Sequence, residues 1–482
     1  MRNGALREFK DGKMKLGPDG LIPKNTMAIA NDNPLGRDAD SLLAAGDSRA
    51  NVQPMLIAFH TLFVREHNRL CDEFKNKDPL ATDEQLFQAA RRLVAAELQA
   101  ITFREYLPAL LGGTDHIPPY QGYNESVNVG MSNIMATAAF RFGHSQVNTH
   151  LWRFEENGTM SHYGHLPLRD AYFSPERVSR EGGVDPLFRG AARQAAQEID
   201  LQMVDDMRNV LFPSGHHGGL DLAAMNIQRG RDHGLPDYNS VRKALGLKEI
   251  TSFADITNDS KIALKFEDLY QDRNNVDLWV AGLAEEHEHR SELGPTFRTI
   301  VMRNFLRIRD GDRFWYERYL SQEEIDQVHS LTLGKIIRQN TGYKSAPDNV
   351  FFSTEYCAGV ENFQCVPHNE TPTGSCESLQ RKLWTLQQDL EKSKQTCDAK
   401  GSVTDATASI DAIDIVLIVL CVLFFLLAGL FLFLFLRAWL LLRRNLLDNV
   451  NAQTDVGLEL RNKSKKESEI YQNACGDLII SY

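Results

Sequence analysis

Cysteine is scarce in this chain of 482 residues: there are seven, too few for a small scaffold held together by disulfides. The first thirty residues contain no apolar run of the kind that forms a secretory signal. The first 350 residues contain no internal repeat, no low-complexity tract and few alternating strand patterns. The net charge of −11 argues against a nucleic-acid partner. A repeat protein, a strand-rich fold and a nucleic-acid-binding protein are therefore disfavoured.

Apolar sequence is abundant enough for a large core, since apolar residues make up 43% of the chain. The helix signals in the first 350 residues are strong. Asp83 and Glu84 open a run in which Leu86, Ala90 and Leu93 recur at helical spacing. We therefore expect a mainly α-helical fold with long loops.

Two short segments carry residues suited to holding an acidic metal cofactor. Residues 140–144 read FRFGH, and residues 226–234 read NIQRGRDHG. An imidazole that binds iron needs a partner on its second ring nitrogen, which sets the tautomer and the basicity of the ring. Guanidinium groups match the carboxylates of an acidic cofactor and stay charged. In this order the two segments resemble the proximal side of an animal-type haem peroxidase.

Further segments extend this pattern along the chain. They are residues 46–51 (GDSRAN), 60–70 (HTLFVREHNRL), 86–112, 275–282 (NVDLWVAG), 309–316 (RDGDRFWY) and 337–341 (IRQNT). In this order they resemble the motifs of the animal-type haem peroxidases, from about residue 5 to about residue 352. The resemblance implies the helical fold of that family and haem b as cofactor. It also implies hydrogen peroxide and small electron donors as substrates.

The resemblance assigns roles to four proximal residues. His144 is the expected axial ligand of the haem iron. Asn226 is expected to accept a hydrogen bond from the other ring nitrogen of His144. Arg141 and Arg229 are expected to face the haem propionates. The alternative for either arginine is a surface ion pair.

Arg49 resembles the distal arginine, which stabilises the charge that develops as a peroxide bond breaks. The alternative is helix capping or an ion pair with Asp47. Val52 stands where related proteins that link haem covalently have a glutamate, so we expect haem to be held without a covalent bond. His60 and His67 lie in the following helix motif, where packing roles are expected.

The start of the chain departs from the family pattern. Residues 7–23 already resemble the segment that follows the calcium-binding loop of longer members. We therefore expect an N-terminally truncated form, and calcium only in a full-length form. The distal histidine motif is missing too. Because general acid–base help is worth roughly 10²–10⁴ in rate, we expect weak turnover.

The C-terminal third has a different character. In residues 376–397 one heptad position is filled by Cys376, Leu383, Leu390 and Cys397, which indicates either a short coiled coil or an amphipathic helix packed on its own domain.

Residues 415–436 carry no charge and reach roughly 33 Å as a helix, enough to cross a bilayer. Three aspartates precede this run and three arginines follow it, namely Asp405, Asp411, Asp414, Arg437, Arg443 and Arg444. The arginines place the tail in the cytoplasm.

The sequence is thus divided into a partial haem peroxidase domain (1–352), a linker (353–375), a coiled-coil stalk (376–397), a juxtamembrane linker (398–414), a transmembrane helix (415–436) and a cytoplasmic tail (437–482). We expect a cell-surface peroxidase with its catalytic domain outside the cell, glycosylated at some of its sequons, and a homodimer linked through the stalk. The alternative is a cell-surface interaction protein that keeps the fold with little or no activity. A fatty-acid dioxygenase is disfavoured, because its radical-tyrosine motif is not found.

Overall fold

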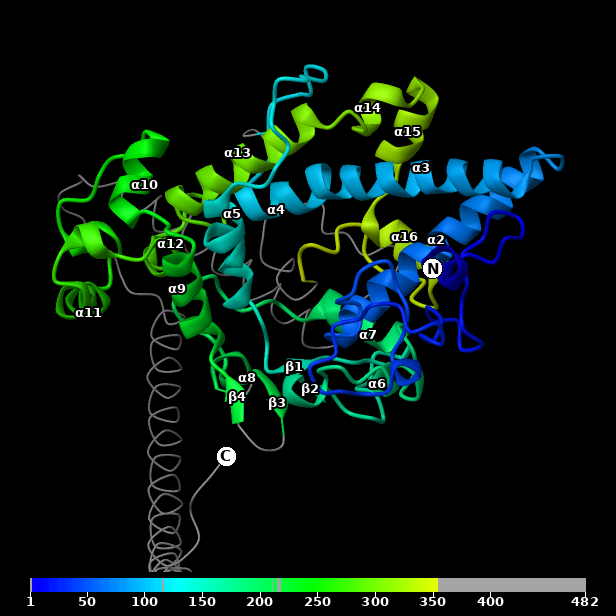
Figure 1. Ribbon diagram of the computed structural model, residues 1–482, viewed down its shortest axis with the longest axis horizontal. Coiled ribbons are helices and arrows are strands. Elements are labelled where there is room, and N and C mark those ends of the chain that lie inside the picture. The colour runs from blue at the N-terminus through cyan, green and yellow to red at the C-terminus, as the bar shows by residue number, and fades with distance from the viewer. Residues whose placement is uncertain (1, 115–116, 210, 215–217, 354–482) are drawn as a thin grey trace, which may run out of the picture. The chain divides into compact units, whose positions relative to one another are not determined.

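A computed structural model describes residues 2–114, 117–209, 211–214 and 218–353, and this part of the chain is mainly helical (Figure 1). The first half contains α1 (Arg2–Leu6), α2 (Pro54–Lys77), α3 (Asp83–Ile101), α4 (Leu107–Leu111), α5 (Asn133–Thr137), α6 (Glu176–Ser179), α7 (Asp185–Arg193) and α8 (Asp205–Arg208). The second half contains α9 (Leu222–Asp232), α10 (Tyr238–Leu245), α11 (Ser260–Tyr270), α12 (Leu278–Ala284), α13 (Pro295–Gly311), α14 (Tyr316–Tyr319), α15 (Gln322–Ser330) and α16 (Leu333–Asn340). The mainly helical fold expected from the sequence is confirmed.

Strands play a small part in the described residues. β1 (His150–Leu151) pairs antiparallel with β2 (Leu166–Pro167), and β3 (Leu211–Ser214) pairs antiparallel with β4 (Gly218–Leu220). Short 3₁₀ turns are η1 (Ala39–Ser41), η3 (Ala139–His144), η4 (Leu168–Asp170), η5 (Phe253–Asp255) and η6 (Arg273–Asn275). The short turn η3 carries the FRFGH segment, and so it matters most for the site.

The longest rod begins at α3 and follows from local signals. Thr82 and Gln85 form a capping box at its start, which satisfies two backbone N–H groups. The periodic residues Leu86, Ala90 and Leu93 are buried, as their spacing predicts. The rod continues through the π-helical turn η2 (Thr102–Tyr106) into α4, and it ends at Gly112 with φ of +87° (Figure 1).

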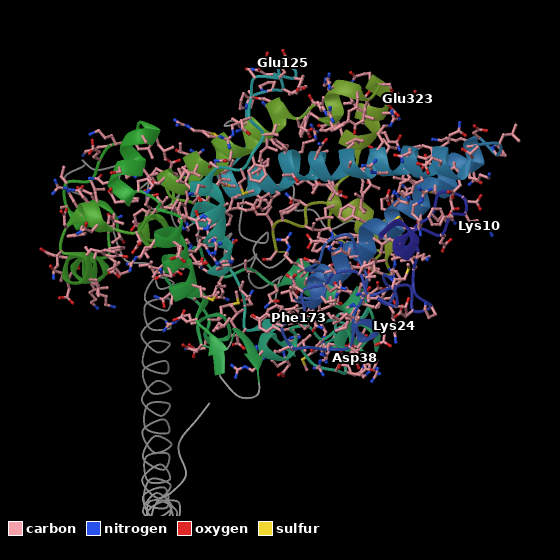
Figure 2. All side chains as sticks on the ribbon, in the orientation of Figure 1. Lys10, Lys24, Asp38, Glu125, Phe173 and Glu323 are labelled. Carbon is pink, nitrogen blue, oxygen red and sulfur yellow. The ribbon has the colours of Figure 1, made fainter. Side chains whose placement is uncertain are left out.

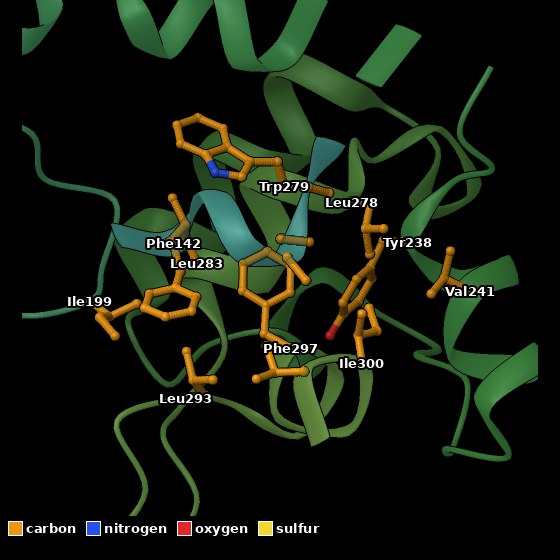
Figure 3. Close-up of a cluster of buried hydrophobic side chains, with 14 of the residues drawn as sticks. Phe142, Ile199, Tyr238, Val241, Leu278, Trp279, Leu283, Leu293, Phe297 and Ile300 are labelled. Carbon is orange, nitrogen blue, oxygen red and sulfur yellow. The ribbon is translucent and has the colours of Figure 1, made fainter. Parts of the chain in front are cut away.

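The largest buried apolar cluster lies beside η3, and we call it the proximal core. Figure 3 shows Phe142 of η3 facing side chains from α10, α12 and α13. Its larger members are Phe142, Tyr238, Leu278, Trp279, Phe297 and Ile300. A Cβ at Gly282 would lie 2.2 Å from the ring of Phe297, so only glycine allows α12 and α13 to approach this closely. The proximal core thus fixes η3 against three helices.

A buried carboxylate ties the same helices together by hydrogen bonds. Glu285 accepts from Tyr238 Oη and Arg242 Nη1, each at 2.6 Å, and from the backbone N–H of Thr296 at 2.8 Å. Burial raises the pKa of Glu285, and these donors oppose that shift. Because its donors come from α10 and α13, the carboxylate links the two helices through the end of α12.

The segments predicted after residue 352 are the linker, the stalk, the transmembrane helix and the cytoplasmic tail. All of them lie outside the described residues, apart from the first residue of the linker. Within the described residues, none of the helices combines the length and the apolar character that crossing a bilayer requires. Cys71 is a buried free thiol in α2, and burial raises its pKa to about 12.

Glu97 of α3 is a buried carboxyl group with an unsatisfied oxygen. Its side chain is turned towards α2, and its Oε2 atom finds no hydrogen-bond donor among the described residues. Burial raises the pKa of Glu97 well above 4.5, and the charge of Glu66 adds to the shift. Arg69 would offset this, but its guanidinium already binds Glu66 at 2.5 Å.

Replacing Glu97 with methionine should stabilise the protein at neutral pH by about 1–3 kcal/mol, because an uncompensated buried polar group is removed. Since its pKa is raised on folding, Glu97 lowers the stability of the wild type as the pH rises above 4.5. The advantage of Glu97→Met should therefore grow with pH. Urea denaturation near pH 4.5 and at neutral pH measures it. The control Glu73→Met, which removes a partner of Arg69 and Lys77, should give no gain.

Candidate haem site

His144 and Asn226 meet although they are 82 residues apart in the chain. His144 is the last residue of η3, and Asn226 lies on the buried side of α9. The Asp221 side chain caps α9 by accepting from the N–H of Ala224, which starts the helix at the right point. The Nδ2 atom of Asn226 lies 2.8 Å from Nδ1 of His144. The two segments singled out from the sequence are therefore joined at their predicted ligand and its partner.

The direction of this hydrogen bond differs from the expectation. Asn226 donates through Nδ2, while its Oδ1 accepts from Arg141 Nη1 at 2.8 Å. The reason is that a guanidinium has only donors, so Arg141 takes the amide oxygen and leaves the nitrogen for His144. For His144 Nε2 to bind iron, Nδ1 must carry the proton. A half-turn of the Asn226 amide presents its oxygen to Nδ1, provided that Arg141 turns to another acceptor.

The electrostatics of the site suit a neutral imidazole. Burial and, to a lesser extent, the positive charge of Arg141 lower the pKa of His144 to about 4, against the opposing hydrogen bond from Asn226. At neutral pH the ring is therefore uncharged, which is the form that binds metals.

The two arginines of the site repel one another. Burial lowers the pKa of Arg141, and the charge of Arg229 adds to the shift. Arg229 is exposed and lies one turn after Asn226 on α9. Within the described residues neither guanidinium forms an ion pair with a carboxylate. The donors of Arg141 go to the neutral oxygens of Ala136 and Asn226. Two adjacent cations without an anion beside a neutral imidazole fit haem, which brings iron and two carboxylates.

Trp279 supports the turn η3, which carries Arg141 and His144. Its role was not predicted from the sequence. It is buried in the proximal core, and its Nε1–H donates to the backbone oxygen of Arg141 at 3.3 Å. The only sequence signal was its place in the NVDLWVAG segment. Figure 3 shows its ring above the turn that holds Phe142.

Arg49 forms the ion pair that was its alternative interpretation. Its guanidinium contacts the Asp47 carboxylate through Nε at 3.0 Å and Nη2 at 2.7 Å. The Arg49 side chain is 69% exposed, so the pair is worth about 0–1 kcal/mol. The bonds from Arg49 hold the pKa of Asp47 well below its usual range. The charges of both residues also act on half-buried His60, whose pKa is lowered mainly by burial.

Val52 has the apolar surroundings that suit a valine. It packs on a small buried cluster that includes Tyr172, Phe173 and Met207. Its backbone oxygen accepts from the N–H of Phe173 at 3.2 Å. Val52 therefore contributes a packing contact at this position. A glutamate here would instead offer a carboxylate.

The family model described as "Animal haem peroxidase" matches residues 1–351. The chain belongs to the animal haem peroxidase family. Peroxinectin A of Dictyostelium discoideum is 40% identical to it over 340 residues, which cover 70% of this chain and 63% of that protein. Lactoperoxidase of Mesocricetus auratus is also 40% identical over 340 residues, 67% of this chain and 48% of that protein. The chain therefore spans less than two thirds of the length of either of these two curated relatives.

Solved structures agree with this family assignment. Peroxidase A from Dictyostelium discoideum superposes with a TM-score of 0.67 at 39% identity, covering 72% of this chain and 68% of that one. Fatty acid alpha-dioxygenase from Oryza sativa superposes with a TM-score of 0.57 at 21% identity, covering 71% of this chain and 61% of that one. At that identity the second match shows a shared fold alone.

Replacing Asn226 with alanine should weaken haem binding by about 10–100-fold, because His144 loses the group that orients it. Asn226→Asp should keep most of the affinity, since a carboxylate accepts from both Nδ1–H and Arg141. Titration of the haem-free protein with haem, followed through the Soret band, measures both. Gln228→Ala removes an exposed α9 side chain bonded only to Asp232, and it serves as the control. Equal affinities for the alanine variant and the wild type would contradict this role of Asn226.

Proposed function

We propose that this chain is a haem-dependent peroxidase that reduces hydrogen peroxide and oxidises small electron donors. The observation that carries the proposal is the His144–Asn226 contact at 2.8 Å, flanked by two arginines without a carboxylate partner in the described part of the chain. Haem b, when bound, supplies the redox chemistry. A scaffold without a cofactor has no need of this arrangement.

Each residue of the proposed site has a separate task. With haem bound, His144 would ligate the iron through Nε2, and Asn226, with its amide oxygen facing Nδ1–H, would hold the proton there and make the imidazole a better donor. Arg141 and Arg229 would bind the two propionates, which would free the amide oxygen of Asn226 from Arg141. Arg49, once released from Asp47, stabilises negative charge as the peroxide bond breaks.

We also propose that turnover by this chain is slow. Arg49 must first leave Asp47 before its guanidinium can act on peroxide. Peroxide cleavage also needs a group that takes a proton from one oxygen and returns it to the other. Among the described residues, His60 lies near Arg49, but it is half-buried on α2, which limits its access to peroxide.

The cofactor assignment is tested by spectroscopy of the purified protein. His144→Ala should lose the Soret band, because the protein's bond to the iron is removed. His150→Ala, an exposed histidine of the same region, should keep it. Acid–acetone should extract all haem from the wild type, because Val52 offers no ester. An unchanged Soret band in His144→Ala would exclude His144 as the ligand.

The second candidate function is an interaction protein that keeps the peroxidase fold without turnover. The exposed, ion-paired state of Arg49 favours it. The two functions differ in one measurement, the peroxide-dependent oxidation of a phenol by protein that shows a Soret band. Haem-loaded protein without such oxidation would favour the interaction protein.

The proposed setting is the cell surface, with the peroxidase domain outside and residues 415–436 in the membrane. Support comes from the length and flanking charges of that segment. Asn124, Asn157 and Asn258, each in a glycosylation sequon, are exposed in the structure. Removal of N-glycans should therefore shift the protein on a gel.

The proposed dimer is linked by disulfides between the stalks of two copies. Cys376 and Cys397 fall at the same heptad position, where each faces its own copy in a parallel pair. Non-reducing gels should show a dimer for the wild type and a monomer for the double variant Cys376→Ser, Cys397→Ser. A monomer in both lanes would reject the dimer, and a dimer in both would reject these cysteines as its link.

A further inference from the structure

A continuous row of aromatic rings leads away from the haem site. It starts at Phe142, two residues before His144, and we call it the ring row. Neighbouring ring centroids are 5.9 Å apart for Phe142–Phe140, 5.7 Å for Phe140–Phe305, 6.0 Å for Phe305–Phe103, 4.9 Å for Phe103–Trp315 and 4.7 Å for Trp315–Tyr316. The row thus passes from η3 through α13 and η2 to the start of α14. Figure 1 shows α14 and α15 beside the long rod of α3.

The far end of the ring row is a tyrosine–histidine pair. The Oη atom of Tyr316 lies 2.8 Å from Nε2 of His329, on α15. The Tyr316 side chain is buried, whereas His329 is half-buried and reaches the surface. Burial raises the pKa of Tyr316, so its phenol is protonated at neutral pH. The hydroxyl donates to Nε2 of His329 when the imidazole carries its own proton on Nδ1, and the neighbouring Glu317 carboxylate is a second acceptor for the same hydroxyl.

The surroundings of His329 keep it able to take a proton. Burial lowers its pKa, and the charge of Arg104 adds to the shift, while Glu317 and Asp326 oppose it. The lowered pKa favours the uncharged ring, which accepts a proton at Nε2 when its own proton is on Nδ1. The same two acids are placed to stabilise an imidazolium once it forms.

Trp315, the ring before Tyr316, has no neighbouring base among the described residues that could take its proton. Its Nε1–H is buried and meets no acceptor in the described part of the chain. An oxidised indole there keeps its proton and stays positively charged in an apolar setting, which is costly. Arg309 lies 5.8 Å from the ring of Phe103 and disfavours positive charge on that ring as well. Along this row, a positive charge is therefore relieved only at Tyr316, where a proton can leave.

We propose that Tyr316, hydrogen-bonded to His329, is a one-electron oxidation site fed along the ring row from the haem site. The inference rests on the proposed function, which supplies the oxidant, peroxide-oxidised haem. Tyr316 gives up one electron, which reduces that oxidant by one equivalent. Its Oη–H bond breaks, the proton moves to His329 Nε2, and a neutral tyrosyl radical remains. An outside donor then returns one electron, and the imidazolium returns the proton, so the phenol is restored.

Such a site moves oxidising power away from the haem site. The phenylalanine rings, which are hard to oxidise, serve as closely spaced packing across which an electron tunnels. The site would serve one-electron donors that contact the surface near α14 and α15 without approaching His144. The competing explanation is that the Tyr316–His329 hydrogen bond only holds α14 against α15.

The experiment uses two oxidants on the full-length chain. One is hydrogen peroxide added to the haem-loaded protein. The other is a photogenerated ruthenium(III) polypyridyl complex, which removes single electrons from the protein without haem. Electron paramagnetic resonance detects a tyrosyl radical, and mass spectrometry of a nitroso spin-trap adduct locates it. Thermal melts confirm that each variant is folded.

Three variants separate proton acceptance from structural support. Tyr316→Phe keeps the packing and should lose the trapped adduct at this position and most of the radical signal. His329→Gln keeps a hydrogen-bond acceptor but not a base, and the signal should fall at least about tenfold, since the proton has no destination. Tyr319→Phe is the matched control, because Tyr319 on the same helix donates only to the backbone oxygen of Arg92. It should leave the signal unchanged.

The outcomes distinguish this site from the proposed function. A full radical signal in Tyr316→Phe, or in His329→Gln, under the ruthenium oxidant would overturn the inference whatever haem does. A radical at Tyr316 with ruthenium but none with peroxide in haem-loaded protein would support the tyrosine–histidine pair and count against haem as its oxidant. A signal with both oxidants that depends on Tyr316 and His329 would support the inference as stated.

Discussion

The hydrogen bond between Asn226 and His144 is the contact on which the haem site depends. It joins a short turn to a helix that follows 82 residues later, and Asn226 is fully buried where the two meet. A buried amide that bonds on both sides leaves little freedom to its partners. One side orients the imidazole, and the other holds Arg141. In this structure the positions of His144, the proposed iron ligand, and of Arg141 therefore depend on a single side chain.

The rest of the proximal half keeps this contact in place. The turn η3 is too short to be stable alone, and it gains its stability by burying Phe142 in the proximal core. Trp279 adds a hydrogen bond to the backbone of the turn. Glu285 links the two helices behind it through a satisfied buried carboxylate. A ligand carried on packed elements and fixed by hydrogen bonds is held with the accuracy that a metal site requires.

Arg49, the expected distal arginine, stands in contrast. Arg49 is exposed and held by a surface ion pair of little energy. The structure is thus well organised for binding a cofactor and loosely organised on the side expected to meet peroxide. In such a protein, cofactor retention and peroxide turnover can respond to different mutations. The ring row leaves the organised side, which is consistent with oxidising power passing outwards through packed rings.

Local patterns in the sequence determined a large part of this protein. The spacing of Leu86, Ala90 and Leu93 predicted α3, because a helix repeats its face every few residues. The motifs around His144 and Asn226 predicted the family and the meeting of the two residues, because ligand and partner types are chemically restricted.

Only the tertiary structure decided the contacts between distant segments. The direction of the Asn226 amide depends on where Arg141 lies, and the pairing of Arg49 with Asp47 depends on the fold of one loop. The support from Trp279, the unsatisfied oxygen of Glu97 and the ring row each depend on side chains brought together from separate helices. A periodic pattern tells which face of a helix is buried. It does not tell which donor, acceptor or ring will face that side chain, because this is settled by packing among all the helices at once.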